Sequence, residues 1–364
     1  MKHCWATRCI DRTGVAHWLS ESSAERLGEL WREADRVRHR RVGDQVHLRG
    51  LVEISNHCIR QCAYCGLRAA NARVVRYRMT AGEILDSAGQ ALRLGYGTVV
   101  LQAGEDYGIT AAWMAEVIRA IKGETGLAVT LSLGERRREE LALWREAGAD
   151  RYLLRFETSN RRLYERIHPT PAGRDDDRFT ILAFLRALGY ETGSGVMVGI
   201  PGQTIDDLAE DILTFGLLDL DMIGIGPFIP HPMTPLAARR EHDASQVPAD
   251  ELTTCKSLAL TRIFRPLANI PATTALATLD RHAGWRAGLS CGANVIMPNL
   301  TPAKYRALYE IYPDKACIYD DVQSNHDHIM ELLASLGRTP GVGRGDSPVF
   351  TARAEKARAG QEVQ

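Results

Sequence analysis

Short apolar segments alternate with longer amphipathic segments along most of the chain. The short segments are rich in β-branched and aromatic residues, a composition that is typical of buried strands. They comprise residues 47–54, 98–102, 128–133, 151–156, 192–200, 222–228, 270–275 and 294–297. The longer segments carry apolar residues at helical spacing and comprise residues 80–94, 111–122, 137–147, 204–218, 251–265 and 302–310. This alternation predicts eight parallel strands joined by right-handed helical connections.

Eight strand–helix repeats favour closure of the sheet into a complete (β/α)8 TIM barrel, a fold that commonly needs about 250 residues. We assign residues 46–345 to this α/β barrel. Residues 1–45 form an N-terminal helical extension, because residues 20–39 place apolar side chains at helical spacing, and we expect this helix to cover one end of the barrel. Residues 346–364 hold few apolar side chains and are expected to be a disordered tail.

Composition narrows the classes of partner. Lys plus Arg and Asp plus Glu number 45 each, so no global field favours nucleic acid or an anionic membrane. No apolar stretch reaches the roughly 20 residues that a membrane-spanning helix needs. Residues 1–13 lack the apolar core of a secretory signal. We therefore expect a cytoplasmic protein with no nucleic-acid partner and no membrane partner.

Three cysteines follow the first predicted strand at the spacing C-x3-C-x2-C: Cys58, Cys62 and Cys65. Cysteine thiolates are the usual protein ligands of iron–sulfur clusters, so this loop can hold three irons of a [4Fe–4S] cube and leave the fourth open. A structural zinc site is an alternative, but it needs four ligands, and His57 is too close to Cys58 to be the fourth. Disulfides would require an oxidising compartment. The sequence assigns no role to four further cysteines, Cys4, Cys9, Cys255 and Cys317, and Cys291 is expected to lie in the core.

Polar residues stand where several predicted strands end, which is where TIM barrels carry their catalytic groups. Glu105 follows the second strand, although an acidic residue there could also complement a helix dipole. Alternation along the fourth strand puts Arg155 and Glu157 on one face, where burial is costly unless they pair with each other or bind a ligand. Thr273 and Thr274 end the seventh strand; they suit a small anion, or they form only local hydrogen bonds.

The cysteine loop, with Tyr64 before its last cysteine, resembles the signature of the radical S-adenosylmethionine (SAM) superfamily. Further motifs cover the whole predicted barrel: LQAGED (101–106), LSLGE (131–135), YLLRFET (152–158), GYETG (189–193), PGQTIDDL (201–208), GIGPFIPHP (224–232), PATT (271–274) and CGANVIMPN (291–299). Together they resemble the HydE family, radical SAM maturases of FeFe-hydrogenase that are related to biotin synthase and methylornithine synthase. The resemblance implies a complete barrel with an internal cavity, and a [4Fe–4S] cluster and SAM as cofactors.

The resemblance also implies roles for individual residues. The cluster would be held by Cys58, Cys62 and Cys65. Cofactor contacts would come from Tyr64, Gln102, Gly104, Glu105, Thr130, Glu135, Arg155, Glu157, Arg178 and Met197. Substrate contacts would come from Ala103, Phe156, Ile229, Thr273, Thr274 and Tyr309. In the family, a reductant such as ferredoxin or flavodoxin supplies the electron, and the 5′-deoxyadenosyl radical attacks an iron–cysteine complex that bears CO and cyanide.

Two positions depart from the family pattern, which usually has Ser where Ala103 stands and His where Phe156 stands. The family's optional second cluster is not supported either, because Asn325 and His328 stand where two of its cysteines would be. One cluster is therefore expected. Three hypotheses remain open: a HydE-type maturase, a HydE-like paralogue that acts on another small molecule such as an amino acid or a thiol compound, and a non-catalytic iron–sulfur or zinc protein.

Overall fold

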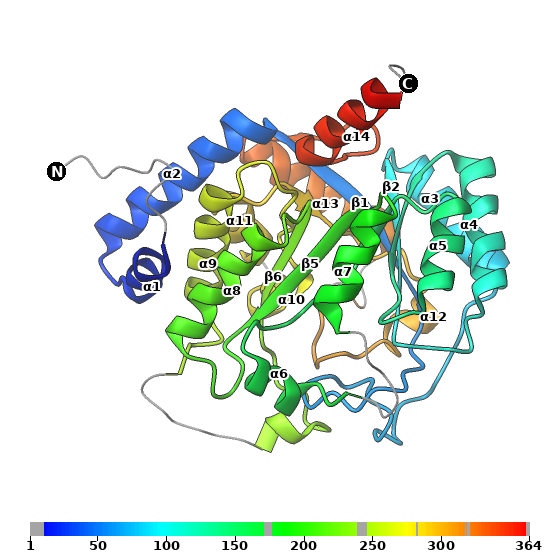
Figure 1. Ribbon diagram of the computed structural model, residues 1–364, viewed down its shortest axis with the longest axis horizontal. Coiled ribbons are helices and arrows are strands. Elements are labelled where there is room, and N and C mark those ends of the chain that lie inside the picture. Colours follow the sequence, from blue (N-terminus) through cyan, green and yellow to red (C-terminus); the bar gives the residue numbers. More distant parts are fainter. Residues whose placement is uncertain are drawn as a thin grey trace.

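The computed structural model describes residues 11–170, 177–238, 246–281, 283–316, 318 and 321–361. A curled, parallel sheet lies at its centre, with the strand order β6-β5-β4-β3-β2-β1-β7 (Figure 1). The strands are β1 (Gln45–Ser55), β2 (Thr98–Ala103), β3 (Ala128–Ser132), β4 (Arg151–Leu153), β5 (Glu191–Val198), β6 (Met222–Pro227) and β7 (Val295–Ile296). Each of these segments is almost wholly buried, which explains its continuous apolar sequence.

Helices cover the outside of the sheet. They are α3 (Ala81–Arg93), α4 (Ala111–Thr125), α5 (Arg138–Glu146), α7 (Arg178–Ala187), α8 (Ile205–Leu217), α9 (Glu251–Phe264), α10 (Thr274–Leu279), α11 (Gly284–Ser290) and α13 (Val322–Ser335). Many begin at a side-chain cap, as at Thr80, Thr110 and Thr204, where the hydroxyl accepts from a backbone N–H of the first turn. Their apolar faces pack on the sheet around fully buried side chains such as Trp144 and Phe215.

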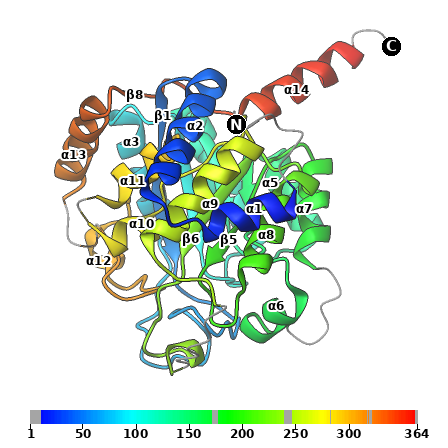
Figure 2. The ribbon, with the colours of Figure 1, turned by 90° about the vertical axis from the view of Figure 1, so that its left-hand side faces the viewer.

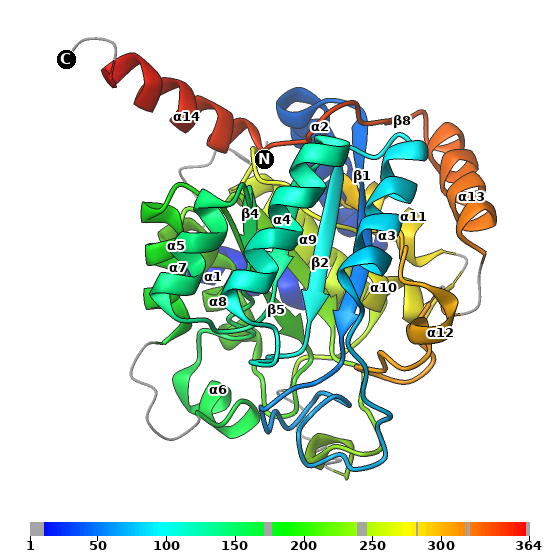
Figure 3. The same cartoon turned by 90° about the vertical axis from the view of Figure 1, so that its right-hand side faces the viewer.

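The loops that follow the strands gather at one end of the sheet. Figure 3 shows β1 and β2 running toward a long loop that joins β1 to α3. Three short helices lie at this same end: α6 (Arg161–Ile167), the 3-10 helix η1 (Pro235–Ala238) and α12 (Ala303–Arg306). This end is the one at which chemistry occurs in barrels of parallel strands.

The predicted seventh strand, residues 270–275, is wrong. Only isolated parallel bridges, Met222 to Asn269 and Pro271 to Val295, link this segment to its neighbours, and α10 begins at Thr274. Thr273 is the N-cap of α10, and a Thr pair that is typical of a strand is equally suited to a helix start. Among the described strands, β6 and β7 are therefore not joined by a full ladder, and the sheet is curled rather than a complete eight-stranded barrel.

The N-terminal extension lies against the side of the helical layer instead of covering one end. Two helices form it, α1 (Arg12–Ser20) and α2 (Ala24–Val42), which pack on α8 and α9 (Figure 2). Val15, Leu30 and Ala34 are fully buried in this contact. The amphipathic pattern correctly indicates an apolar face, but it carries no information on which surface receives that face.

The C-terminal segment also differs from the expected disordered tail. Strand β8 (Thr339–Pro340) pairs with the start of β1, and α14 (Pro348–Gln361) follows. Arg353 on α14 binds Asp221, at 2.6 Å, so charge rather than apolar area docks the start of this helix. None of the described helices has the length and apolar character needed to cross a membrane.

Candidate active site

The cysteine loop is held tightly against the end of β2. The Ile59 N–H donates to the Glu105 carbonyl at 3.0 Å, and the Gly104 N–H donates to the Ser55 carbonyl at 3.1 Å. A Cβ atom on residue 104 would overlap the His57 carbonyl oxygen, so only glycine permits this approach. Gly104 thus supports the loop from behind and is not among the residues that line the cavity.

The three cysteines line one cavity of about 340 Å³ at the mouth of the sheet. Burial raises the pKa of all three thiols, that of Cys62 to about 12, and the nearby thiols raise the pKa of Cys65 further. Deprotonation in this environment therefore requires a strong local positive charge, which bound iron supplies. Within the described residues, no three His, Cys, Asp or Glu side chains converge to hold one metal ion. The three thiols nevertheless line the same cavity, as the ligands of one iron–sulfur cluster must.

A buried network of charges lies beside the cysteines. Arg60 contacts Glu135 at 3.1 Å and Glu105 at 3.5 Å, and Arg178 contacts Glu135 at 2.8 Å. Burial and the neighbouring Glu135 raise the pKa of Glu105. Burial and the two guanidinium groups, which lie at its ring nitrogens, lower the pKa of His168 far below its usual range. The sequence predicted the acidic members and Arg178, but it gave no indication of Arg60 or His168.

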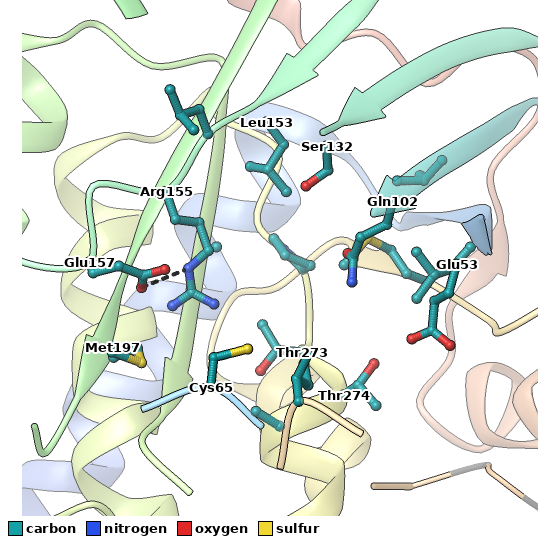
Figure 4. A pocket seen from close by; sticks show the side chains of 18 of the residues that line it. Glu53, Cys65, Gln102, Ser132, Leu153, Arg155, Glu157, Met197, Thr273 and Thr274 are labelled. Atoms are coloured by element: carbon teal, nitrogen blue, oxygen red, sulfur yellow. Dashed lines mark ion pairs between the residues drawn. The ribbon is translucent and has the colours of Figure 1, made fainter. Parts of the chain in front are cut away.

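Arg155 and Glu157 lie on one wall of the cavity, as the alternation predicts (Figure 4). The Arg155 Nε atom is 3.3 Å from Glu157 Oε2, yet the geometry is poor and neither atom has a hydrogen-bond partner among the described residues. Glu157 has a φ of 63°, in the left-handed region that L-residues rarely adopt. Its backbone is held there by bonds to Gly195 and Met197 of β5. A strained residue with a buried, unsatisfied carboxylate is arranged to receive a ligand.

Asp211 on α8 stabilises the turn that carries Glu157. Its carboxylate accepts hydrogen bonds from the Ser159 N–H and hydroxyl, from the Thr158 hydroxyl at 3.2 Å, and from the Gln203 amide at 3.0 Å. Burial raises the pKa of Asp211 to about 7, although these donors oppose the shift. This carboxylate was missed in the sequence because it lies in the apolar face of an amphipathic helix.

The opposite wall of the cavity is also polar. Gln102 donates to the Tyr309 hydroxyl at 3.3 Å, and Lys315 forms a buried ion pair with Glu53 at 2.7 Å. Figure 4 shows Glu53 and Gln102 across the cavity from Arg155. Glu53 and Lys315 were not predicted. Glu53 could have been found, because it is a charged residue in phase with the inward face of the first strand. Lys315 lies in an irregular segment that has no pattern.

Most predicted site residues meet at this cavity. Its lining includes Cys58, Cys62, Tyr64, Cys65, Gln102, Ala103, Glu105, Thr130, Arg155, Glu157, Arg178, Met197, Ile229, Thr273, Thr274 and Tyr309. The Thr130 hydroxyl is buried there and has no hydrogen-bond partner among the described residues. Glu135 does not line the cavity but anchors the two arginines. Cys4, Cys9 and Cys317 lie outside the described residues, and Cys255 is buried on α9.

Phe156 requires a correction, because the structure places it outside the cavity. Its ring stacks on Phe179 at 5.3 Å and packs against Phe215 at 5.7 Å, between the sheet and the outer helices. The alternation that turns Arg155 inward turns Phe156 outward. A family position was thus treated as a substrate contact although its side chain belongs to the core.

Comparison with known proteins identifies the family. The model of the radical SAM superfamily matches residues 52–215. The chain is 48% identical over 312 residues to the [FeFe] hydrogenase maturase subunit HydE of Thermotoga maritima, covering 86% of each protein. The chain belongs to the radical SAM superfamily. It is therefore an enzyme that uses a [4Fe–4S] cluster and SAM, and the hypothesis of a non-catalytic protein is wrong.

Other radical SAM proteins are more distant. The chain is 29% identical over 280 residues to 3-methylornithine synthase of Methanosarcina acetivorans, covering 76% of each protein. The crystal structure of methylornithine synthase (PylB) superimposes with a TM-score of 0.78 at 26% identity, covering 91% of this chain and 94% of that one. The cavity fits both radical SAM cofactors, because three thiols line it together with Glu157 and Arg155, whose Oε2 and Nε atoms have no hydrogen-bond partner among the described residues.

Proposed function

We propose that this radical SAM enzyme is a HydE-type maturase in FeFe-hydrogenase assembly, acting on a small iron–cysteine complex that bears CO and cyanide. One observation carries the proposal: identity to HydE is 48% over 86% of both chains, against 29% over 76% for 3-methylornithine synthase. A reductant such as ferredoxin or flavodoxin supplies the electron.

The residues divide into a side that holds the cofactors and a side that meets the substrate. Cys58, Cys62 and Cys65 hold the cluster, which together with SAM supplies a carbon-centred radical when reduced. Glu157 offers its unsatisfied carboxylate to the SAM ammonium, and Arg178, held by Glu135, offers a fixed guanidinium toward the SAM carboxylate. Both charges are in place before binding, so binding does not have to order them.

The far wall orients the substrate and keeps water out. Tyr309 is fixed by Gln102 and by its backbone contact with the Lys315 ammonium at 3.0 Å. Thr273 and Thr274 lie at the start of α10 and line the cavity, and the Thr273 hydroxyl is fixed there because it donates to the Ile225 carbonyl and accepts from the Leu276 N–H. Hydroxyl groups at a helix start suit a small anionic group of the substrate.

Anaerobic reconstitution with iron and sulfide, followed by dithionite, SAM and the iron–cysteine complex, tests the proposal. We expect formation of 5′-deoxyadenosine together with a new paramagnetic product that depends on the complex. The matched control is Cys62→Ala, which should fold but bind little iron. Formation of 5′-deoxyadenosine without any change in the complex would reject the HydE substrate while retaining radical chemistry.

One observation favours the second candidate, a paralogue that acts on an amino acid or a thiol compound. Ala103 lines the cavity where the family usually has Ser, so a hydrogen-bonding group is missing from the wall. Phe156 adds nothing to this argument because it faces the outer helices. The variant Ala103→Ser separates the two: a gain in conversion of the iron–cysteine complex would indicate that the natural substrate differs.

A further inference from the structure

The long loop after β1 carries an unusual charge distribution. Residues 56–79 include five arginines, which are Arg60, Arg68, Arg73, Arg76 and Arg78, and no Asp, Glu or Lys. The chain as a whole is neutral, so this charge is local. Positive charge around the cluster ligands is expected to attract an anionic partner toward them.

Most of this charge is not neutralised by neighbouring carboxylates. Arg60 is buried and paired with Glu105 and Glu135, and Arg78 is paired with the buried Asp106. Arg76, by contrast, donates only to backbone carbonyls, including those of Asn56 and Leu67 at the cysteine loop. Among the described residues, no carboxylate forms an ion pair with Arg68, Arg73 or Arg76.

The same loop carries exposed apolar side chains close in sequence to the cluster ligands. Cys58 and Cys65 on this loop are partly buried, whereas Cys62 is buried. Ile59, which follows Cys58, is 45% exposed, and Val75 is 65% exposed. The two residues flank Asn56, whose side chain donates to the Val75 carbonyl at 2.8 Å. Exposed apolar side chains beside unpaired arginines are typical of an interaction surface.

Acidic side chains lie at the other end of the cysteine loop. Glu310 and Asp314 are exposed and belong to the segment after β7, which contacts the loop through the bond from the Gly66 N–H to the Ile311 carbonyl at 2.9 Å. The Cys58 end instead meets Glu105, whose carboxylate is buried. The basic side chains lie between these two ends, because Arg68 contacts Gln61 and Arg76 contacts the Leu67 carbonyl.

We infer that this basic face, made of Arg68, Arg73, Arg76, Ile59 and Val75, is the docking surface for a small acidic one-electron carrier protein. The inference rests on the proposed function, because that function needs one electron delivered to the cluster in each cycle. The carrier gives one electron to the oxidised cluster through the Cys58 edge and leaves oxidised by one electron. Such encounters use small interfaces, below about 1,200 Å², and depend on charge for their rate.

Charge reversal on this face tests the inference. The probe is an acidic flavodoxin reduced to its hydroquinone, mixed anaerobically with the reconstituted enzyme while cluster reduction is followed by absorbance. We expect Arg68→Glu with Arg73→Glu to lower the second-order rate constant at low salt by about tenfold or more, and the paired Gln variants to lower it less. Salt should slow the wild type and have little effect on the charge-reversed variant.

The matched control places the same change at the opposite end of the sheet. Arg40→Glu with Arg41→Glu, at the exposed end of α2 before β1, should change the rate less than twofold. Arg68 also contacts Gln61, so its replacement could disturb the cysteine loop. Two controls detect such damage: the single variant Arg73→Glu, which changes only an exposed side chain, and the iron content of each variant. The docking surface would be overturned if the rate constant fell equally in the Arg68/Arg73 and Arg40/Arg41 double variants. It would also be overturned if the wild-type rate constant did not depend on salt.

Reduction by dithionite keeps the two proposals apart, because it needs no docked protein. All variants should be reduced by dithionite within twofold of the wild type. If dithionite and SAM give no 5′-deoxyadenosine with the wild type, the proposed function fails, while the flavodoxin rates still test the docking surface. If dithionite works and the flavodoxin rate ignores Arg68 and Arg73, the docking surface alone is wrong.

Discussion

Two Arg–Glu pairs lie at opposite ends of the same curled sheet, and they differ in how fully their polar atoms are hydrogen-bonded. Arg151 at the start of β4 pairs with Glu191 of β5, and both side chains are fully buried. Arg155, four residues later, pairs loosely with Glu157 at the cavity. The first pair is completed by the protein, whereas the second has polar atoms left without partners.

The C-terminal segment completes the first pair. Arg151 donates to the Thr98 hydroxyl at 2.9 Å and to the Arg344 carbonyl at 2.7 Å, and Glu191 accepts the Ser347 N–H at 2.9 Å. Within the part of the chain that the structure describes, no comparable segment donates to Glu157 Oε2. Since the protein can satisfy a buried Arg–Glu pair when the pair is structural, the unsatisfied one indicates a ligand.

The largest effect should follow from breaking the completed pair. Glu191→Gln removes the fully buried counter-ion of Arg151 and leaves only its ion pair with the partly exposed Asp346, so we expect the free energy of unfolding to fall by about 3 kcal/mol. Urea denaturation of the apo protein, followed by circular dichroism, measures this. A loss below about 1 kcal/mol would show that the segment at residues 344–347, not the ion pair, stabilises this end.

The same change at the cavity should act on binding instead of stability. Glu157→Gln removes a charge-assisted contact, so we expect the affinity for SAM to fall by about 10- to 100-fold, the equivalent of roughly 1.5–3 kcal/mol. The free energy of unfolding of the apo protein should change by less than about 1 kcal/mol. Calorimetric titration with SAM and urea denaturation, run on the same preparation, would contradict the comparison if stability fell as far as in Glu191→Gln.

The Asp211 carboxyl group, which supports the turn at Glu157, makes the stability of the protein depend on pH. Its pKa is raised from 3.8 to about 7 in the folded protein, so the folded state holds a proton that the unfolded state releases between these values. The stability that this group contributes is present below about pH 4 and is lost as the pH rises to about 7. Asp211→Asn should flatten this part of the curve of stability against pH and weaken SAM binding through the Glu157 turn. An unchanged slope in the variant would assign the pH dependence to another group.

The smallest effect is expected at Phe156. Because its ring packs on Phe179 and Phe215, Phe156→Leu should lower the free energy of unfolding by about 1–2 kcal/mol and leave the KM values for SAM and substrate unchanged. Ala103→Ser serves as the contrast, since it alters the cavity wall with little cost to the core. A shift in substrate KM with Phe156→Leu would restore this residue to the site.

The sequence predicts those parts of the fold and site that depend on local pattern. Apolar runs located β1 to β6, and the cysteine spacing located the cluster ligands. The error at residues 270–275 arose because Thr273 and Thr274 are suited both to a strand and to a helix cap, and only the packing of α10 decides between them. Charge–charge partners could not be predicted, since Arg60 and His168 meet across a separation of 108 residues.

The direction of a strand side chain was predictable wherever the rule of alternation was applied consistently. Alternation gave the inward direction of Arg155 and Glu157, and the same rule excludes Phe156 from the cavity. Lys315 could not be located by any rule of this kind, because its position depends on an irregular segment that Glu53 holds in place. Irregular segments that are fixed by one buried ion pair carry no periodic signal.

The segment that completes the Arg151 pair comes after every strand of the sheet in the order of synthesis. Translation proceeds at about 5–20 residues per second, so the end of the sheet at which β4 and β5 begin stays uncovered until residues 344–347 have left the ribosome. The cysteine loop, some 280 residues earlier, has by then already been synthesised. Synthesis of the cluster ligands and completion of the opposite end of the sheet are thus separated in time by the order of the chain itself.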